Sequence, residues 1–155
     1  MISTSIKPDN GLSRATSPQG ILQSVLAGLN EGRISKVVEQ FDELFTFDDH
    51  ALGLEFSDKE RLTEFFQKSR ELFPEAAVEV DSTRECGDHA IAEWKLTATE
   101  SVPFGPVRLR SPISLRGTSI VQIKNGRVIR WSDYYDRVMS RRVSLAAFFE
   151  DWGER

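Results

Sequence analysis

The sequence predicts an α+β fold, with helices first and an antiparallel sheet of about four long strands after them. Up to Pro74, apolar residues recur at helical spacing, and after Pro74 they alternate with polar residues as in a strand with one buried face. A long sheet with one apolar face must curl or be covered. We therefore expect a curved sheet that wraps as a cone around the Phe-rich helix of residues 57–73 and encloses an apolar pocket.

Composition limits the class of protein. The 155 residues suit one domain, and 39% hydrophobic residues with ten Phe and three Trp provide the bulk for a core. A net charge of −4 argues against nucleic-acid binding, which needs a basic patch. No apolar run is long enough for a membrane span, and the single Cys86 cannot form an internal disulfide. Because the N-terminus lacks the apolar core of a signal peptide, a cytoplasmic location is expected.

The first part of the chain predicts a tail and two helices. Residues 1–17 are rich in small polar residues and predict a flexible tail, which leaves residues 18–155 as a single domain. Ser17-Pro18 suits the start of a helix, and Gly32 suits its end. A second, short helix is expected from residue 34 to about residue 41.

The next part predicts a short extended segment and the long helix. In residues 44–49, Phe45, Phe47 and Asp49 alternate with their neighbours, as in a short strand or an extended turn. Ser57 and Glu60 form a capping box at the start of the long helix. The apolar face of this helix comprises Leu62, Phe65, Phe66, Leu72 and Phe73.

After Pro74 the pattern is that of strands and turns. Gly87-Asp88 and Asn125-Gly126 predict tight turns, and the latter is the strongest hairpin signal in the chain. Residues 103–106 are expected to form a loop, and Pro112 indicates a sheet edge or a bulge. The predicted strand segments cover residues 78–84, 90–98, 107–115, 118–124 and 127–135, and a C-terminal helix with apolar residues from Val138 to Trp152 is expected to cover an opening.

The last predicted strand carries the first candidate site residue. Alternation predicts one face that is apolar except for Asp133; it comprises Ile129, Trp131, Asp133 and Tyr135. A carboxyl group in such surroundings must be paired, protonated or hydrated. Burial would raise its pKa and make Asp133 a usable acid or base near neutral pH. The alternative is a structural ion pair with an arginine such as Arg116.

His50 is the second candidate, as a base or as a hydrogen-bond donor to a ligand oxygen. Asp48 and Asp49 could orient its ring, and the alternative is a loop histidine that caps backbone carbonyls. With His89 distant in the sequence, no convincing metal-ligand spacing is present, so no metal site is expected. The expected pocket wall comprises Trp94, Trp131, Tyr135, Phe65 and Phe66, although such residues are more often simply core.

Three stretches of sequence carry a resemblance to a known family. They are FPE and VEV around residues 73–80, GDHAIAEWKLTATE at 87–100, and RGTSIVQIKNGRVIRWSDYYD at 116–136. Over roughly residues 20–150 the chain resembles SnoaL-like proteins of the nuclear transport factor 2-like superfamily. That group includes polyketide cyclases, ketosteroid isomerase, limonene epoxide hydrolase and scytalone dehydratase. The resemblance implies a cystatin-like α+β barrel with a deep apolar cavity, usually in a dimer.

The resemblance also implies site residues. Asp133 matches the acid in the W-x-D end of the epoxide hydrolase, whereas Trp94-Lys95-Leu96 stands where that enzyme has Arg-x-Asp. The position of the isomerase's base falls near His50. We therefore expect a protein that binds a small lipophilic, oxygen-bearing molecule and catalyses a cofactor-free isomerisation, cyclisation or dehydration, with a homodimer as the assembly. The alternative is a non-catalytic module for ligand binding or protein interaction on the same scaffold.

Overall fold

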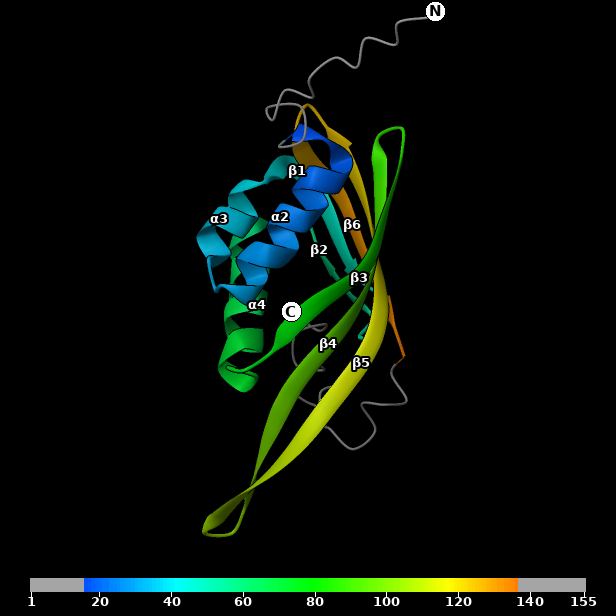
Figure 1. Cartoon of the computed structure of the whole chain (residues 1–155). Helices are drawn as coiled ribbons and strands as arrows, with labels where there is room; N and C mark the ends of the chain where they lie inside the picture. The colour runs from blue at the N-terminus through cyan, green and yellow to red at the C-terminus, as the bar shows by residue number, and fades with distance from the viewer. Residues whose placement is uncertain (1–15, 137–155) are drawn as a thin grey trace, which may run out of the picture.

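The structure is a computed structural model, and it describes residues 16–136. Within this range a six-stranded sheet has the order β2-β1-β6-β5-β4-β3, and helices α2, α3 and α4 lie together on one side of it (Figure 1). The helices are α2 (Pro18–Asn30), α3 (Ile34–Glu39) and α4 (Lys59–Leu72). The strands are β1 (Phe41–Asp49), β2 (Leu54–Phe56), β3 (Ala77–Cys86), β4 (His89–Phe104), β5 (Val107–Lys124) and β6 (Arg127–Tyr135).

The α+β class predicted from the sequence is confirmed. The pair β1–β6 is parallel and the other pairs are antiparallel, so the sheet is mixed. The sheet does not close into a barrel, because β2 and β3 remain as separate edges. The N-terminal tail up to residue 15 and the predicted C-terminal helix lie outside the described residues. Among the residues described, no helix has the length and apolar character needed to cross a membrane.

The first two helices begin where the sequence predicts. The Ser17 side chain accepts a hydrogen bond from Gly20 N at 3.0 Å, which satisfies a free amide at the start of α2. Helix α3 ends at Glu39, sooner than expected, because Phe41 already belongs to β1. The side chain of Phe41 is fully buried and its backbone pairs with Val128. Pairing within the sheet therefore overrides the helical spacing.

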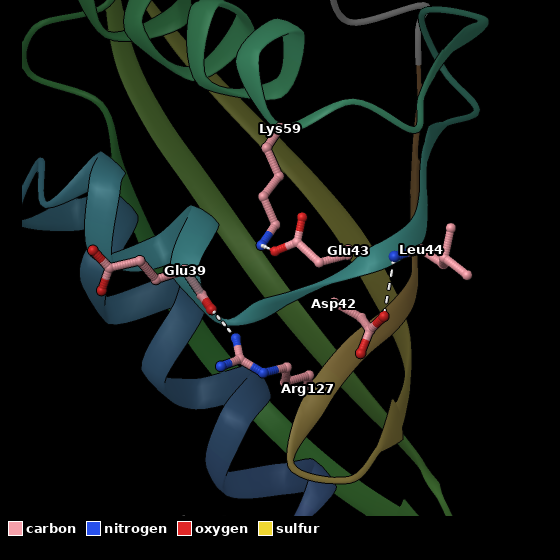
Figure 2. A network of polar contacts seen from close by, with 6 residues as sticks. All are labelled: Glu39, Asp42, Glu43, Leu44, Lys59 and Arg127. Carbon is pink, nitrogen blue, oxygen red and sulfur yellow. Dashed lines mark hydrogen bonds and ion pairs between the residues drawn. The ribbon is translucent and has the colours of Figure 1, made fainter.

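The start of α4 differs by one residue from the predicted capping box. Asp58, rather than Ser57, is the N-cap, and its carboxylate accepts a hydrogen bond from Arg61 N at 2.9 Å. Figure 2 shows how the ends of elements are joined nearby: Lys59 Nζ lies 2.6 Å from Glu43 Oε1 on β1. In the same view the Arg127 side chain donates to the carbonyl of Glu39 at 2.6 Å and ties the β5–β6 turn to α3.

The last hairpin confirms its turn and corrects its register. Asn125 and Gly126 both have positive φ, 51° and 74°, as a two-residue turn of this kind requires. A bulge follows, because Gln122 pairs with Arg130 whereas Ile123 pairs with Val128. The extra residue is Ile129. Because of it, Val128 takes the place in the core that was predicted for Ile129, and Val128 and Trp131 are both buried there. Beyond the bulge, Trp131, Asp133 and Tyr135 share a face as predicted.

The two longest strands form one hairpin that projects beyond the helices (Figure 1). Strand β6 pairs with β5 from Gly117 to Lys124, so residues 107–116 have β4 as their only paired neighbour in the described chain. Pro112 lies in this open edge, as predicted. The predicted loop at residues 103–106 is shorter, because β4 continues to Phe104.

Candidate functional site

A cavity of about 180 Å³ lies between the helices and the sheet. Most of its wall is apolar. Leu26 and Leu29 come from α2, Phe65 comes from α4, and Phe73 follows directly after α4. The sheet contributes Phe47, Trp94, Leu96, Trp131 and Tyr135. Two carboxyl groups, Asp49 and Asp133, also line the cavity, whereas none of its described lining residues is Lys, Arg or His. The site therefore combines an apolar wall with two acids and no positive side chain in the described residues.

The two acids lie side by side because β1 and β6 are parallel neighbours. In the register of these strands Asp49 is the partner of Asp133. Along β1, Phe45, Phe47 and Asp49 are buried and their neighbours are more exposed, so one alternating face carries the carboxylate inward. The sequence predicts for Asp49 only that it could orient the ring of His50. The alternation in residues 44–49 contained the signal for its inward position, but its meeting with Asp133 depends on the tertiary pairing.

The Asp133 carboxyl is held by neutral donors through one oxygen. Its Oδ1 accepts from Ser119 Oγ at 2.5 Å and from Trp131 Nε1 at 2.7 Å. Trp94 Nε1 in turn donates to Ser119 Oγ at 2.9 Å. Within residues 16–136, Asp133 Oδ2 has no hydrogen-bond partner. Of the two oxygens of Asp133, Oδ2 is therefore the one that the described residues leave without a hydrogen bond.

The Asp49 carboxyl has different partners. Its Oδ1 accepts from Leu52 N at 2.9 Å, and its Oδ2 accepts from the hydroxyl of Tyr135 at 2.9 Å. The residue is 5% exposed, yet it lines the cavity. Tyr135 thus connects a predicted wall position to the second acid.

Burial dominates the electrostatics of both acids. It raises the pKa of Asp133 from 3.8 to about 7, opposed by the hydrogen bond from Ser119, assisted by the charge of Asp49, and opposed by Trp131. Burial also raises the pKa of Asp49, against the bonds from Leu52 and Tyr135 that favour its ionised form. The two carboxylates repel each other when both are charged, so a proton on Asp133 removes this repulsion.

The alternative of an ion pair between Asp133 and Arg116 is not seen in the described residues. The Arg116 guanidinium lies 3.1 Å from Asp81 Oδ2, on the outer side of the sheet, and not against Asp133. No described arginine or lysine forms a salt bridge with Asp133. Within residues 16–136 the Asp133 carboxyl is thus held by neutral donors and not by a cation.

The other predicted residues divide between cavity, core and outer surface. Trp94, Trp131, Tyr135 and Phe65 line the cavity. Phe66 lies in the core instead, where its ring meets that of Phe47 edge-on at 5.6 Å.

His50 is exposed, and its ring stacks on Tyr134 at 4.3 Å between centroids. Its backbone amide donates to the carbonyl of Asp133, but its ring is not among the groups that line the cavity. Across residues 16–136 no three His, Cys, Asp or Glu side chains gather as a metal site would require.

Comparison with solved structures defines the class of fold. The chain is similar to AclR of Streptomyces galilaeus, named as a hydroxylase, with 16% identity, coverage of 87% of each chain and a TM-score of 0.68. It is also similar to a protein of Shewanella putrefaciens CN-32 named as a SnoaL-like polyketide cyclase, with 12% identity, coverage of 81% of this chain and 93% of that chain, and a TM-score of 0.70. IdmH of Streptomyces antibioticus, named as a polyketide cyclase, gives 17% identity, coverage of 79% and 94%, and a TM-score of 0.69.

These likenesses place the chain among proteins of the nuclear transport factor 2-like fold. The family description SnoaL-like domain matches residues 22–131, and the chain belongs to this family. No curated protein matches the sequence. The resemblance seen in the sequence is thereby confirmed at the level of family and fold, and one fold of this kind supports many chemistries.

Proposed function

We propose that the cavity binds a small lipophilic molecule with a carbonyl or similar oxygen and catalyses a cofactor-free proton transfer on it. Isomerisation, cyclisation and dehydration all belong to this class. The observation that supports the proposal is the pair Asp49 and Asp133, a buried and a partly buried carboxyl with unlike partners that line one apolar cavity. Environments that separate the protonation states of two acids assign one as acid and the other as base.

Asp133 is the acid in this proposal. Its Oδ1 already accepts two hydrogen bonds, so the proton belongs on Oδ2, from which it points to a ligand oxygen. A pKa of about 7 keeps a large fraction of the molecules protonated at neutral pH. A neutral carboxyl in an apolar site is a strong donor to an oxygen on which negative charge develops.

Asp49 is the base. The backbone amide of Leu52 and the hydroxyl of Tyr135 stabilise its carboxylate. In the reaction, Asp49 removes a proton from the carbon next to the ligand carbonyl, and the electron pair of that C–H bond forms the new C=C bond. The carbonyl oxygen takes the resulting charge and the hydrogen bond or proton from Asp133. Return of the proton to another carbon completes an isomerisation, with no outside reagent.

The volume of the cavity limits the size of the ligand. Since a water molecule occupies roughly 30 Å³ in the liquid, 180 Å³ is the space of about six waters. Cavities for drug-sized ligands begin near roughly 300 Å³. A monocyclic compound therefore fits the cavity better than a tetracyclic one.

Exchange of carbon-bound hydrogen tests the proposal with a defined probe. Cyclohexanone in deuterium oxide exchanges the hydrogens next to its carbonyl, and proton NMR measures the rate. We expect the wild-type protein to accelerate this exchange and Asp49→Asn and Asp133→Asn each to lower it by about 100-fold, within the range typical of one acid or base. Asp48→Asn is the matched control, since Asp48 lies next to Asp49 but interacts with Arg130 on the opposite face. Equal rates in wild type and Asp49→Asn would refute the proposal.

The non-catalytic module is the second candidate. Trp94, Lys95 and Leu96 stand at the place of the hydrolase's Arg-x-Asp, and the Trp94 indole there bonds Ser119 instead of holding a water. Binding without catalysis would be favoured if cyclohexanone shifts the NMR signals of the protein in a saturable way while the rate of hydrogen exchange stays at that of buffer alone.

We further propose a homodimer in the cytoplasm, formed through the outer face of the sheet. Ile91 and Tyr134 are 39% and 41% exposed there, and Ile120 lies between them as the register partner of Ile91. Charges of both signs surround these residues, so a second copy can match the face about a two-fold axis. They are Glu93, Lys95, Arg116 and Arg130.

Light scattering after size-exclusion chromatography tests the dimer. We expect twice the mass of 17.6 kDa for the wild type and the monomer mass for Ile91→Asp, because a buried unpaired charge opposes association. Leu109→Asp is the control, since Leu109 is 54% exposed in the projecting part of β5 and alternation places it on the same face as buried Leu115, opposite to the proposed interface. A monomeric wild type at micromolar concentration would contradict the dimer.

A further inference from the structure

We propose that Trp94, Ser119 and Gly117 form a positioning relay that directs the acidic proton of Asp133 to the oxygen facing the cavity. The inference rests on the proposed function and names residues outside the two acids. It concerns which of the two oxygens of one carboxyl group reaches a ligand as a donor.

The direction of the relay follows from the chemistry of its donors. An indole nitrogen can donate but cannot accept, so in the contact of 2.9 Å with Trp94 Nε1 the Ser119 oxygen is the acceptor. The single hydroxyl proton of Ser119 is then directed to Asp133 Oδ1 at 2.5 Å. Trp131 donates to the same oxygen. Oδ1 is thereby occupied as an acceptor, and the carboxyl proton is left to Oδ2.

Burial and register hold the relay in place. Ser119 is 1% exposed and is the cross-strand partner of Asp133 on β6. In the described residues the Ser119 hydroxyl bonds to two groups, Trp94 Nε1 and Asp133 Oδ1. A change at Trp94 therefore acts on Asp133 through Ser119.

Gly117 provides the space for the indole. Trp94 and Gly117 are cross-strand partners, and a Cβ at position 117 would overlap Trp94 Cη2. The ring lies over the glycine and reaches Ser119, which is two residues further along the same face of β5. The requirement for glycine here is one of space, because its φ is not positive. Even alanine would displace the ring and its hydrogen bond.

A double-mutant cycle tests the relay. Carbon-13 NMR of the aspartate carboxyls measures the pKa of Asp133 in wild type, Trp94→Phe, Ser119→Ala and the double variant. Removing a donor to the carboxylate raises its pKa, and we expect a rise of about one unit in Ser119→Ala, as the loss of one hydrogen bond implies. Trp94→Phe keeps the ring and should give a smaller rise. Because Trp94 acts through Ser119, the double variant should match Ser119→Ala.

The control cycle uses a donor that does not pass through Ser119. Trp131→Phe and Ser119→Ala should raise the pKa additively, because each removes a separate bond to Oδ1. Gly117→Ala should reproduce Trp94→Phe. Thermal unfolding and near-ultraviolet circular dichroism show whether each variant is folded; if Gly117→Ala does not fold, the Trp94 and Ser119 cycle still decides.

Additive effects of Trp94→Phe and Ser119→Ala would overturn the relay. The titration is independent of turnover, so the two proposals fail separately. Coupled pKa changes without cyclohexanone exchange would retain the relay and refute the proposed function. Cyclohexanone exchange that depends on Asp133, together with additive pKa changes, would support the proposed function and refute the relay. If both hold, Ser119→Ala should also lower the exchange rate, by about tenfold.

Discussion

At the scale of single residues, the site differs from an ordinary buried salt bridge. Asp133 is held by a serine hydroxyl and an indole, and a second carboxyl, that of Asp49, is its partner on the neighbouring strand. Neutral donors do not offset the full cost of burying a negative charge. The raised pKa of Asp133 therefore predicts that the stability of the fold depends on pH.

The free energy of unfolding should fall as pH rises from about 4 to about 7. In this range folded Asp133, with a pKa of about 7, holds a proton that the unfolded chain, with 3.8, has released. The difference corresponds to at most about 4 kcal/mol. Asp133→Asn should make this pH dependence shallower, because the amide remains neutral throughout. Urea unfolding at several pH values measures the slope.

The Asn variant should also be more stable than the wild type above about pH 8, where Asp133 is charged. Asp48→Asn is the control, with a slope close to that of the wild type. An unchanged slope in Asp133→Asn would show that this carboxyl is ionised in the folded protein at all these pH values.

At the scale of elements, local signals compete over short distances. Ser57 and Asp58 both suit an N-cap, and the structure uses Asp58, whose carboxylate accepts from Arg61 N. Phe41 suits the helical stripe before it and the strand after it, and its burial against β6 decides for the strand. Adjacent residues of similar propensity are separated by tertiary contacts.

The cap of α4 provides a direct measurement of this competition. Asp58→Ala should lower the free energy of unfolding by about 1 kcal/mol, because Arg61 N loses its acceptor. Ser57→Ala should change it by less than about 0.5 kcal/mol. Chemical unfolding of the two variants compares them. The reverse order would assign the cap to Ser57, as the capping box predicts.

At the scale of the whole molecule, the cavity has a charge preference. Its described wall contains Asp49 and Asp133 and lacks a basic side chain. A ligand with a carboxylate would place a third acid beside them and would have to be protonated to enter. The protein should therefore prefer neutral ligands over anionic ones of equal size.

Binding of a matched pair of probes tests this preference. Cyclohexanone should bind at least about tenfold more tightly than cyclohexanecarboxylate near pH 8. A cavity that raises the pKa of the bound carboxylate by one unit weakens binding of its charged form by about 1.4 kcal/mol, which is a factor of ten. NMR titration of the indole signals of Trp94 and Trp131, which line the cavity, measures both affinities. Equal affinities would indicate that a positive group reaches the cavity.

Patterns along the chain predicted the class of fold, the family and part of the site. The change of period at Pro74 predicted helices followed by strands, and Asn125-Gly126 predicted the last hairpin. Alternation beyond Trp131 predicted that Asp133 and Tyr135 share a face. These features are local, since they depend on spacing along one helix or one strand.

The tertiary structure decided which of these faces meet. The parallel pairing of β1 with β6 brought Asp49 to Asp133, and the bulge at Ile129 exchanged that residue for Val128 in the core. The tertiary structure also placed the His50 ring on Tyr134 instead of in the cavity. The physical reason is that periodicity specifies the faces of an element, whereas long-range pairing and close packing specify its neighbours.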